Sequence, residues 1–161
     1  MKFNFEQRWS ADADRVMAVY TDQAFWEGLS GLSATGAPEV LGVETRGSTT
    51  VVRLHYRLAV DLPSEAARFI DTSNVAWIQE TTWNLDDRSA RVAFLPDQAG
   101  RLIGASATTK LFEHDSGAVR KVSGEVKVRI PLLGSRVERA IVAGVGDHLA
   151  EETVQVQSQL G

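Results

Sequence analysis

The sequence predicts an α+β fold in which a curved, seven-stranded antiparallel sheet wraps around a long C-terminal helix. Apolar side chains recur at every second position at the N-terminus and again over residues 39–130, a period typical of half-buried strands. Beyond Pro131 the apolar spacing becomes that of a helix and stays so over about thirty residues. Two short helical segments separate the first strand from the other six. The expected order is therefore one strand, two helices, six strands and one helix.

Size and composition restrict the class of protein. The 161 residues fit one domain spanning 1–161, and 43% apolar with 24% charged residues is the balance of a folded globular chain. A net charge of -4 provides no basic surface for nucleic acid, and no window is apolar enough for stable insertion into a membrane. Cysteine is absent, which excludes thiolate metal sites and fits a reducing cytoplasm. We expect a cytoplasmic monomer or weak homodimer without a cofactor.

The N-terminal segment is predicted to form a strand followed by two short helices. Over residues 2–9 the side chains of Phe3, Phe5 and Trp9 share one face, and the segment lacks the apolar run of a signal peptide. Ser10 or Asp12 can cap a first helix that reaches about residue 20. A second helix begins at about residue 22 and carries three apolar residues, Phe25, Trp26 and Leu29.

Six further strands are expected in three hairpins, with a helical turn over residues 63–69 after the first hairpin. Their predicted ranges are 40–46, 49–60, 75–85, 89–95, 103–113 and 119–130. The second of them places its apolar residues on one face, namely Val52, Leu54, Tyr56, Leu58 and Val60. One face of the sheet is therefore expected to be buried and the other to be wet.

The last predicted element is a helix with one broad apolar stripe. The stripe comprises Leu133, Val137, Ile141, Val145, Leu149, Val156 and Leu160. Charged residues, including Glu151 and Glu152, are expected off the stripe and in solvent. The helix thus lies with its apolar face on the sheet.

This order of elements resembles the START-like or helix-grip superfamily, which includes Bet v 1-type proteins and polyketide cyclases. The most specific local feature is the segment 126–138, in which a last strand enters a helix through Pro131-Leu132-Leu133-Gly134. It looks like the junction in an actinobacterial family of unknown function within that superfamily, DUF2505. Pro131 cannot continue the strand ladder, and Gly134 is expected to relieve the turn.

The resemblance implies a hydrophobic cavity between the sheet and the terminal helix, where members of the superfamily carry lipids, sterols or aromatic polyketides. The residues expected to line it are Trp26, Leu54, Tyr56, Leu58, Trp77, Trp83, Phe94, Ile141, Gly144, Val145 and His148. An interior filled by the same aromatic side chains is the alternative, because aromatic residues dominate protein cores. Trp26 has two interpretations, at an entrance or packed on the sheet edge.

Two glycines interrupt the terminal helix and need an explanation. Gly144 and Gly146 each cost about 1 kcal/mol relative to alanine in a helix. Either the helix passes close to side chains of the sheet, or the missing side chains leave room for a ligand.

Titratable residues give few candidates for chemistry. His55, His114 and His148 share no metal-binding spacing, so no metal site is expected. His148 on the terminal helix can reach the cavity mouth, and Glu80 and Tyr56 can carry protons if they point inward.

Three functions are compatible with these features. The first is a non-enzymatic binding or transport module for a hydrophobic small molecule. The second is a cyclase, aromatase or dehydratase-like enzyme, which requires at least two of Glu80, Tyr56 and His148 to converge in one pocket. The third is a scaffold with a filled interior, which would expose an apolar patch for a protein partner.

Overall fold

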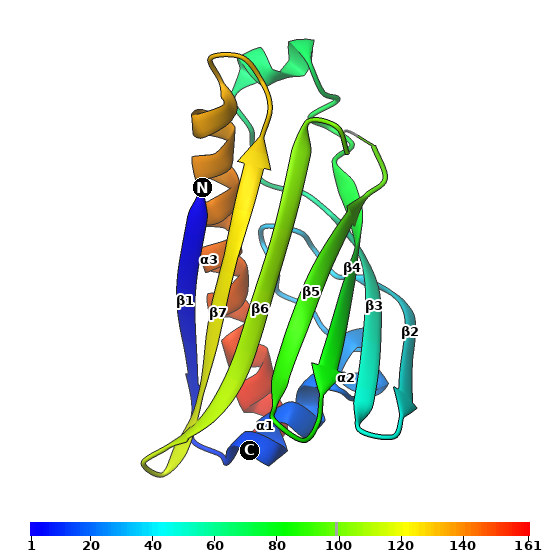
Figure 1. Cartoon of the computed structure of the whole chain (residues 1–161), viewed down its shortest axis with the longest axis vertical. Coiled ribbons are helices and arrows are strands. Elements are labelled where there is room, and N and C mark those ends of the chain that lie inside the picture. Colours follow the sequence, from blue (N-terminus) through cyan, green and yellow to red (C-terminus); the bar gives the residue numbers. More distant parts are fainter. Residues whose placement is uncertain (99) are drawn as a thin grey trace.

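The computed structural model describes residues 1–98 and 100–161 and contains the elements in the predicted order (Figure 1). They are β1 (Lys2–Trp9), α1 (Ala13–Tyr20), α2 (Gln23–Glu27), β2 (Glu39–Arg46), β3 (Thr49–Arg57), the 3-10 turn η1 (Ser64–Arg68), β4 (Ala76–Asn84), β5 (Ser89–Pro96), β6 (Ile103–His114), β7 (Gly117–Val128) and α3 (Gly134–Leu160). The predicted fold class is confirmed.

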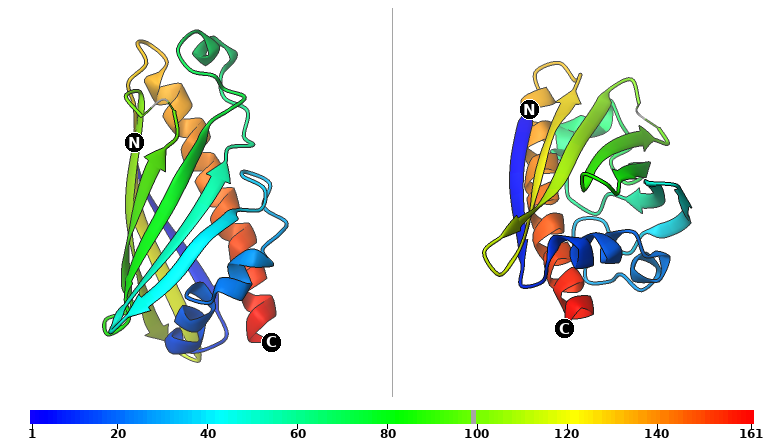
Figure 2. Two further views of the ribbon diagram at one scale, coloured as in Figure 1. Left: turned by 90° about the vertical axis from the view of Figure 1, so that its right-hand side faces the viewer. Right: turned by 60° about the horizontal axis from the view of Figure 1, so that its bottom comes forward.

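All seven strands belong to one antiparallel sheet with the order β1-β7-β6-β5-β4-β3-β2. The first strand pairs with the last, so β1 forms one edge of the sheet and β2 the other. The sheet curves, and α3 runs along its concave side while α1 and α2 lie at one end (Figure 2). Within the described ranges, no helix has the length and apolar character needed to cross a bilayer.

The strand β3 shows how alternation builds the buried face. Val52, Leu54 and Tyr56 are each only 1% exposed, whereas Arg53 and Arg57 are exposed. The strand ends at Arg57 and not at residue 60, as the apolar pattern predicted. The backbone N–H of Leu58 still donates to the carbonyl of Val75 at 2.8 Å, but that of Ala59 donates to the carbonyl of Ala34 at 2.7 Å, so the chain leaves the ladder at Ala59.

Aspartate side chains start both short helices. The Asp12 carboxylate accepts a hydrogen bond from the backbone N–H of Arg15 at 2.9 Å, so Asp12, and not Ser10, caps α1. In the same way, Asp22 accepts from the backbone N–H of Ala24 at 3.1 Å and caps α2.

The bend between β7 and α3 places its strain at a different residue from the one predicted. Leu132 adopts a left-handed conformation with φ of 66°. Gly134 is required for another reason, since a Cβ atom there would lie 2.5 Å from the backbone oxygen of Val128. The glycine therefore permits close approach of helix and strand, and Leu132 makes the turn.

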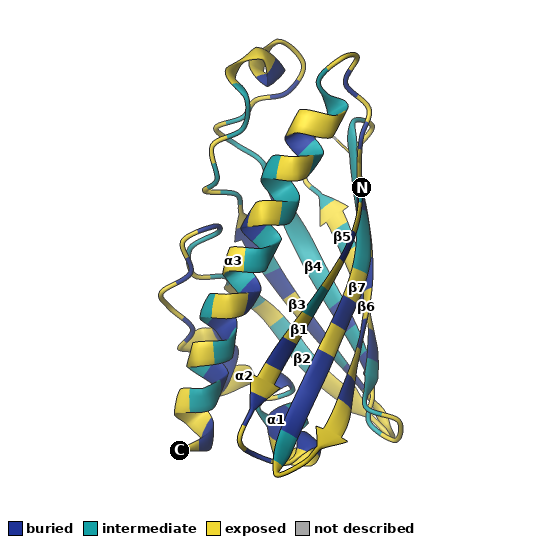
Figure 3. Cartoon of the chain, turned by 90° about the vertical axis from the view of Figure 1, so that its left-hand side faces the viewer, coloured by how far each residue is buried: buried dark blue, intermediate teal, exposed yellow. Residues whose placement is uncertain are grey.

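The helix α3 buries one face against the sheet and exposes the other (Figure 3). Its buried residues are Val137, Gly144, Leu149, Glu152, Val156 and Leu160. The prediction that Glu152 faces solvent is wrong, because this residue is only 3% exposed. Its neighbour Glu151 points elsewhere and accepts a hydrogen bond from the backbone N–H of Ser33 at 2.6 Å.

Candidate functional site: an apolar cavity with a buried ionic cluster

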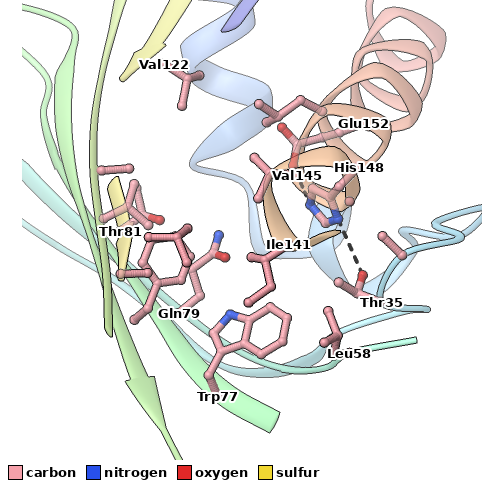
Figure 4. Close-up of a pocket in the computed structure, with 18 of the residues that line it drawn as sticks. Thr35, Leu58, Trp77, Gln79, Thr81, Val122, Ile141, Val145, His148 and Glu152 are labelled. Carbon is pink, nitrogen blue, oxygen red and sulfur yellow. Dashed lines mark hydrogen bonds and ion pairs between the residues drawn. The ribbon is translucent and has the colours of Figure 1, made fainter. Parts of the chain in front are cut away.

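A cavity of about 170 Å³ lies between the concave face of the sheet and α3. Its wall is mainly apolar and includes side chains from the sheet and from α3. Figure 4 shows α3 supplying Ile141, Val145 and His148 on one side and β4 supplying Trp77, Gln79 and Thr81 on the other. Glu152 marks a polar region of the same wall.

Most residues that the sequence placed at the cavity do line it. They are Trp26, Leu58, Trp77, Trp83, Phe94, Ile141, Gly144, Val145 and His148. Leu54 and Tyr56 do not form part of this wall, although both point to the inner side of the sheet. Leu54 is covered because it packs in the hydrophobic cluster formed with residues of α1 and α2. That these residues bind a ligand stays a prediction.

Tyr56 lies directly behind the wall. Its ring stacks on Trp77 with a centroid distance of 5.8 Å and meets the ring of His148 edge-on at 5.4 Å. Burial, together with the negative charge of Glu152, raises the pKa of the Tyr56 hydroxyl well above its usual value. Tyr56 is therefore neutral near pH 7.

Glu80 lies outside the cavity. Along β4 the inward positions are taken by Trp77, Gln79 and Thr81, so alternation turns Glu80 to the outer face. There its carboxylate pairs with the Nε atom of Arg53 at 3.2 Å. Of the three candidates for proton transfer, only His148 lines the cavity.

A buried ionic cluster, which the sequence did not reveal, forms one part of the cavity wall. The Glu152 carboxylate accepts hydrogen bonds from the Tyr20 hydroxyl at 2.6 Å and from Nη1 of Arg120 at 3.2 Å. Arg120 also donates to Thr109 at 2.7 Å and to the Gln7 side-chain oxygen at 2.9 Å. We call the set Gln7, Tyr20, Thr109, Arg120, His148 and Glu152 the ionic cluster.

The strand pattern contained a usable signal for this cluster. Gln7 occupies a position of the same parity as Phe3 and Trp9, and Arg120 shares its parity with Val122. Both are inward positions, and both residues are buried, at 3% and 7% exposed. A polar residue at an inward position of each of two strands that pair side by side therefore marks a buried polar site.

Opposed effects set the ionisation of Glu152. Burial raises its pKa, but the hydrogen bond from His148 and the positive charge of Arg120 outweigh burial and lower the pKa to about 2. Burial and the nearby charge of Glu152 raise the pKa of Tyr20 well above its usual value. At neutral pH the cluster thus holds a carboxylate against a guanidinium, with Tyr20 as a neutral donor.

Both ring nitrogens of His148 face partners in the protein. Nδ1 lies 3.4 Å from the Thr35 hydroxyl, and Nε2 lies 3.4 Å from a Glu152 carboxylate oxygen. The other two histidines lie outside the cavity. His55 contacts Asp97 at 2.7 Å on the outer side of the sheet, and His114 lies beside Asp115 in the β6–β7 turn. Among residues 1–98 and 100–161, no group of histidine and carboxylate side chains is arranged to hold a metal ion.

The two helix glycines are explained mainly by close packing. A Cβ atom at Gly144 would lie 2.9 Å from a methyl group of Val60, and one at Gly146 would lie 3.1 Å from the ring of Phe5. Gly144 also lines the cavity, so both explanations hold for it. For Gly146, only the contact with the sheet is observed.

The sheet wrapped around a terminal helix, with a cavity between them, defines the START-like helix-grip class. The protein TTHA0849 from Thermus thermophilus superposes with a TM-score of 0.70 at 16% identity over 100% of both chains. The Zhui aromatase/cyclase from a Streptomyces species gives 0.63 at 17% identity, over 99% of this chain and 92% of the other. A START superfamily protein from Mycobacterium smegmatis gives 0.60 at 10% identity, over 98% and 95%. At such identities the likeness defines the fold alone.

The particular family follows from the sequence itself. Residues 4–159 match the model of the family described as "Protein of unknown function (DUF2505)", and the chain belongs to that family. No curated protein matches the chain.

Proposed function

We propose that this protein binds a small hydrophobic molecule in the cavity between the sheet and α3, as a carrier or sensor and not as a catalyst. The observation that supports the proposal is the apolar cavity of about 170 Å³. An engineered cavity of roughly 150 Å³ with an apolar lining stays dry and binds benzene. A ligand of one or two rings, or a short acyl chain, fits this volume without movement of the wall. A sterol or a tetracyclic polyketide would require the cavity to widen.

The charges at the cavity support a neutral ligand. Arg120 and Glu152 are both at the wall, but they neutralise each other at 3.2 Å. An anion entering the cavity would compete with Glu152 for Arg120, and a cation would compete with Arg120 for Glu152. Either exchange leaves one buried charge unpaired, which is costly.

The arrangement of His148 favours binding over catalysis. A general base needs a free nitrogen within hydrogen-bond reach of the ligand. In this protein Thr35 and Glu152 lie against the two nitrogens of His148, while Glu80 is outside and Tyr56 is behind the wall. The convergence of two of these residues in one pocket, which a cyclase-like reaction requires, is therefore not observed.

A scaffold that binds protein partners has less support still. The large apolar side chains that are exposed, Leu41, Phe69, Leu95, Phe112, Leu132 and Val154, come from six separate parts of the fold. A docking patch requires such side chains to be contiguous over several hundred Å².

Native mass spectrometry of the protein purified without detergent tests the proposal. We expect a retained small molecule, or uptake of one- and two-ring hydrophobic compounds at micromolar concentration. The variant Ala105→Phe should abolish uptake, since Ala105 lines the cavity. Its control is Ser106→Phe, the next residue on β6, whose side chain is exposed on the outer face.

The two variants separate cavity binding from surface binding. Loss of uptake in Ala105→Phe with uptake unchanged in Ser106→Phe supports the proposal. Equal uptake by both variants, or no uptake by the wild-type protein of any compound tested, overturns it.

A further inference from the structure

The wall of the cavity contains a hydrogen-bond donor that the protein does not satisfy. The indole Nε1–H of Trp77 is buried and has no acceptor among the residues that the structure describes. The Tyr56 hydroxyl is also buried without a partner among these residues, but Tyr56 does not form part of the cavity wall. Trp77 itself lines the cavity. Figure 4 shows its ring nitrogen on the side of the ring nearer to Gln79 and Ile141, which belong to the two opposite walls.

The Trp77 donor differs from the indole donor of Trp26, another tryptophan of the cavity wall. Trp26 also lines the cavity, but its Nε1–H donates to the backbone oxygen of Tyr20 at 2.9 Å. Buried indole N–H groups usually find a partner, because an unmet buried donor destabilises the folded state. An unmet donor in the wall of a cavity therefore points to an acceptor that arrives with the cavity's occupant.

The neighbourhood of Trp77 determines what kind of acceptor is suitable. Tyr56 stacks on the indole, and the next inward side chain on β4 is the neutral amide of Gln79. The ionic cluster does not serve this position, since Arg120 is engaged with Thr109, Gln7 and Glu152. His148 of the same cluster lies between Thr35 and Glu152. A neutral oxygen matches a neutral N–H donor here, whereas a carboxylate would be buried without a counter-charge.

We infer that the ligand carries a neutral carbonyl, ether or hydroxyl oxygen on an apolar skeleton of one or two rings, and that this oxygen accepts a hydrogen bond from Trp77 Nε1–H. The inference rests on the proposed function and specifies the ligand class for the same cavity. Gln79 is the next inward side chain of β4 and lines the same cavity, so an oxygen bound to Trp77 would lie on the β4 side of the ligand.

Two probes of nearly equal shape, 1-indanone and indane, test the inference. They differ by the carbonyl oxygen, so the ratio of their dissociation constants isolates the hydrogen bond. The variant Trp77→Phe keeps an aromatic ring and removes the donor. We expect it to lower the preference for 1-indanone over indane by roughly three- to tenfold, the value of one neutral hydrogen bond. Trp9→Phe, the matched control, should leave the ratio unchanged, because the Trp9 indole is not part of the cavity wall and donates to the backbone oxygen of Thr153 at 3.1 Å.

A second measurement follows the hydrogen bond in the wild-type protein itself. The chain has four tryptophans, and the Trp77 indole N–H resonance is assigned by its absence in Trp77→Phe. In the wild-type protein 1-indanone should move that resonance downfield, and indane should not. A ratio that is unaltered in Trp77→Phe, or equal effects of both probes on the resonance, overturns the inference while the proposed function stands. Failure of both probes to bind the wild-type protein contradicts the proposed function itself.

Discussion

At the scale of single residues, the ionic cluster places one positive and one negative charge in the protein interior. The side chains of Arg120 and Glu152 are 8% and 4% exposed, so each charge depends on the other. Arg120 also lies over the ring of Tyr20, with 4.4 Å from the guanidinium carbon to the ring centroid. Burial of such a pair adds little net stability, but removal of one partner leaves an uncompensated charge.

Glu152→Gln tests this dependence. We expect the free energy of unfolding to fall by about 3–5 kcal/mol at pH 7, because Arg120 loses its counter-charge. Urea denaturation followed by tryptophan fluorescence measures the loss. The control is Glu151→Gln, which removes a carboxylate that is not buried, and its effect should stay below about 1 kcal/mol. Equal losses in the two variants would contradict the role of the cluster.

The pH dependence of stability has a definite sign. The pKa of Glu152 is lowered in the folded protein, from 4.5 to about 2, so the ionised carboxylate stabilises the fold above pH 4.5. This contribution disappears as the pH falls from about 4.5 to 2, and it amounts to on the order of 3 kcal/mol. Denaturation midpoints measured across this window should fall more steeply for the wild-type protein than for Glu152→Gln. Parallel curves would argue against an ionised Glu152.

At the scale of elements, the edge strand β1 depends on a glycine in its neighbour. Phe3 of β1 pairs with Gly124 of β7, and the Phe3 ring covers the glycine. A Cβ atom at Gly124 would lie 2.4 Å from that ring and 2.6 Å from the backbone oxygen of Ser106. The absence of a side chain at Gly124 therefore lets the ring of Phe3 pack closely against β7.

Gly124→Ala should destabilise the protein by about 1–3 kcal/mol, because the new methyl group overpacks this contact. Hydrogen exchange should show the loss concentrated in β1. Gly104→Ala on β6 is the matched control, since a Cβ atom there meets no atom within 4 Å. Its effect should lie within about 0.5 kcal/mol of zero. Comparable destabilisation by the two variants would refute the packing argument.

The elements were more predictable than the site. Alternation of apolar residues located every strand, and the helix starts were predicted to within a few residues, with Ser10 or Asp12 as the first cap, because these signals are local. Glu152 was misplaced because a charged residue is expected in solvent, although it lies three residues after Leu149 and four before Val156, on the same face of the helix. Its burial depends on Gln7 and Arg120, which reach it from strands distant in the sequence.

At the scale of the whole molecule, the cavity is a property of distances between elements and not of any one element. Trp77, Phe94 and Ile141 were predicted to lie near each other, yet the sequence left open whether they fill the interior. That outcome depends on how far α3 is held from the sheet, which contacts such as Gly146 with Phe5 determine. No periodicity in the sequence reports such a separation.

A cavity makes the folded protein larger than its atoms require, so pressure should unfold it. The volume change of unfolding should be less negative in Ala105→Phe than in the wild-type protein, by on the order of 20 mL/mol or more, because the void is filled. The free energy of unfolding should rise by about 0.5–2 kcal/mol. High-pressure fluorescence measures both quantities, with Ser106→Phe as the control. An unchanged volume in Ala105→Phe would show that the cavity is not a void in solution.

The pairing of β1 with β7 also has a consequence for synthesis of the chain. Lys2 pairs with Glu125 and Trp9 with Ala118. The strand β1 is therefore synthesised more than one hundred residues before the strand with which it pairs. During translation the aromatic stripe of Phe3, Phe5 and Trp9 has neither the neighbouring strand nor α3 to cover it. This apolar stripe is therefore open to a chaperone during synthesis, and the fold closes only when the last helix has emerged.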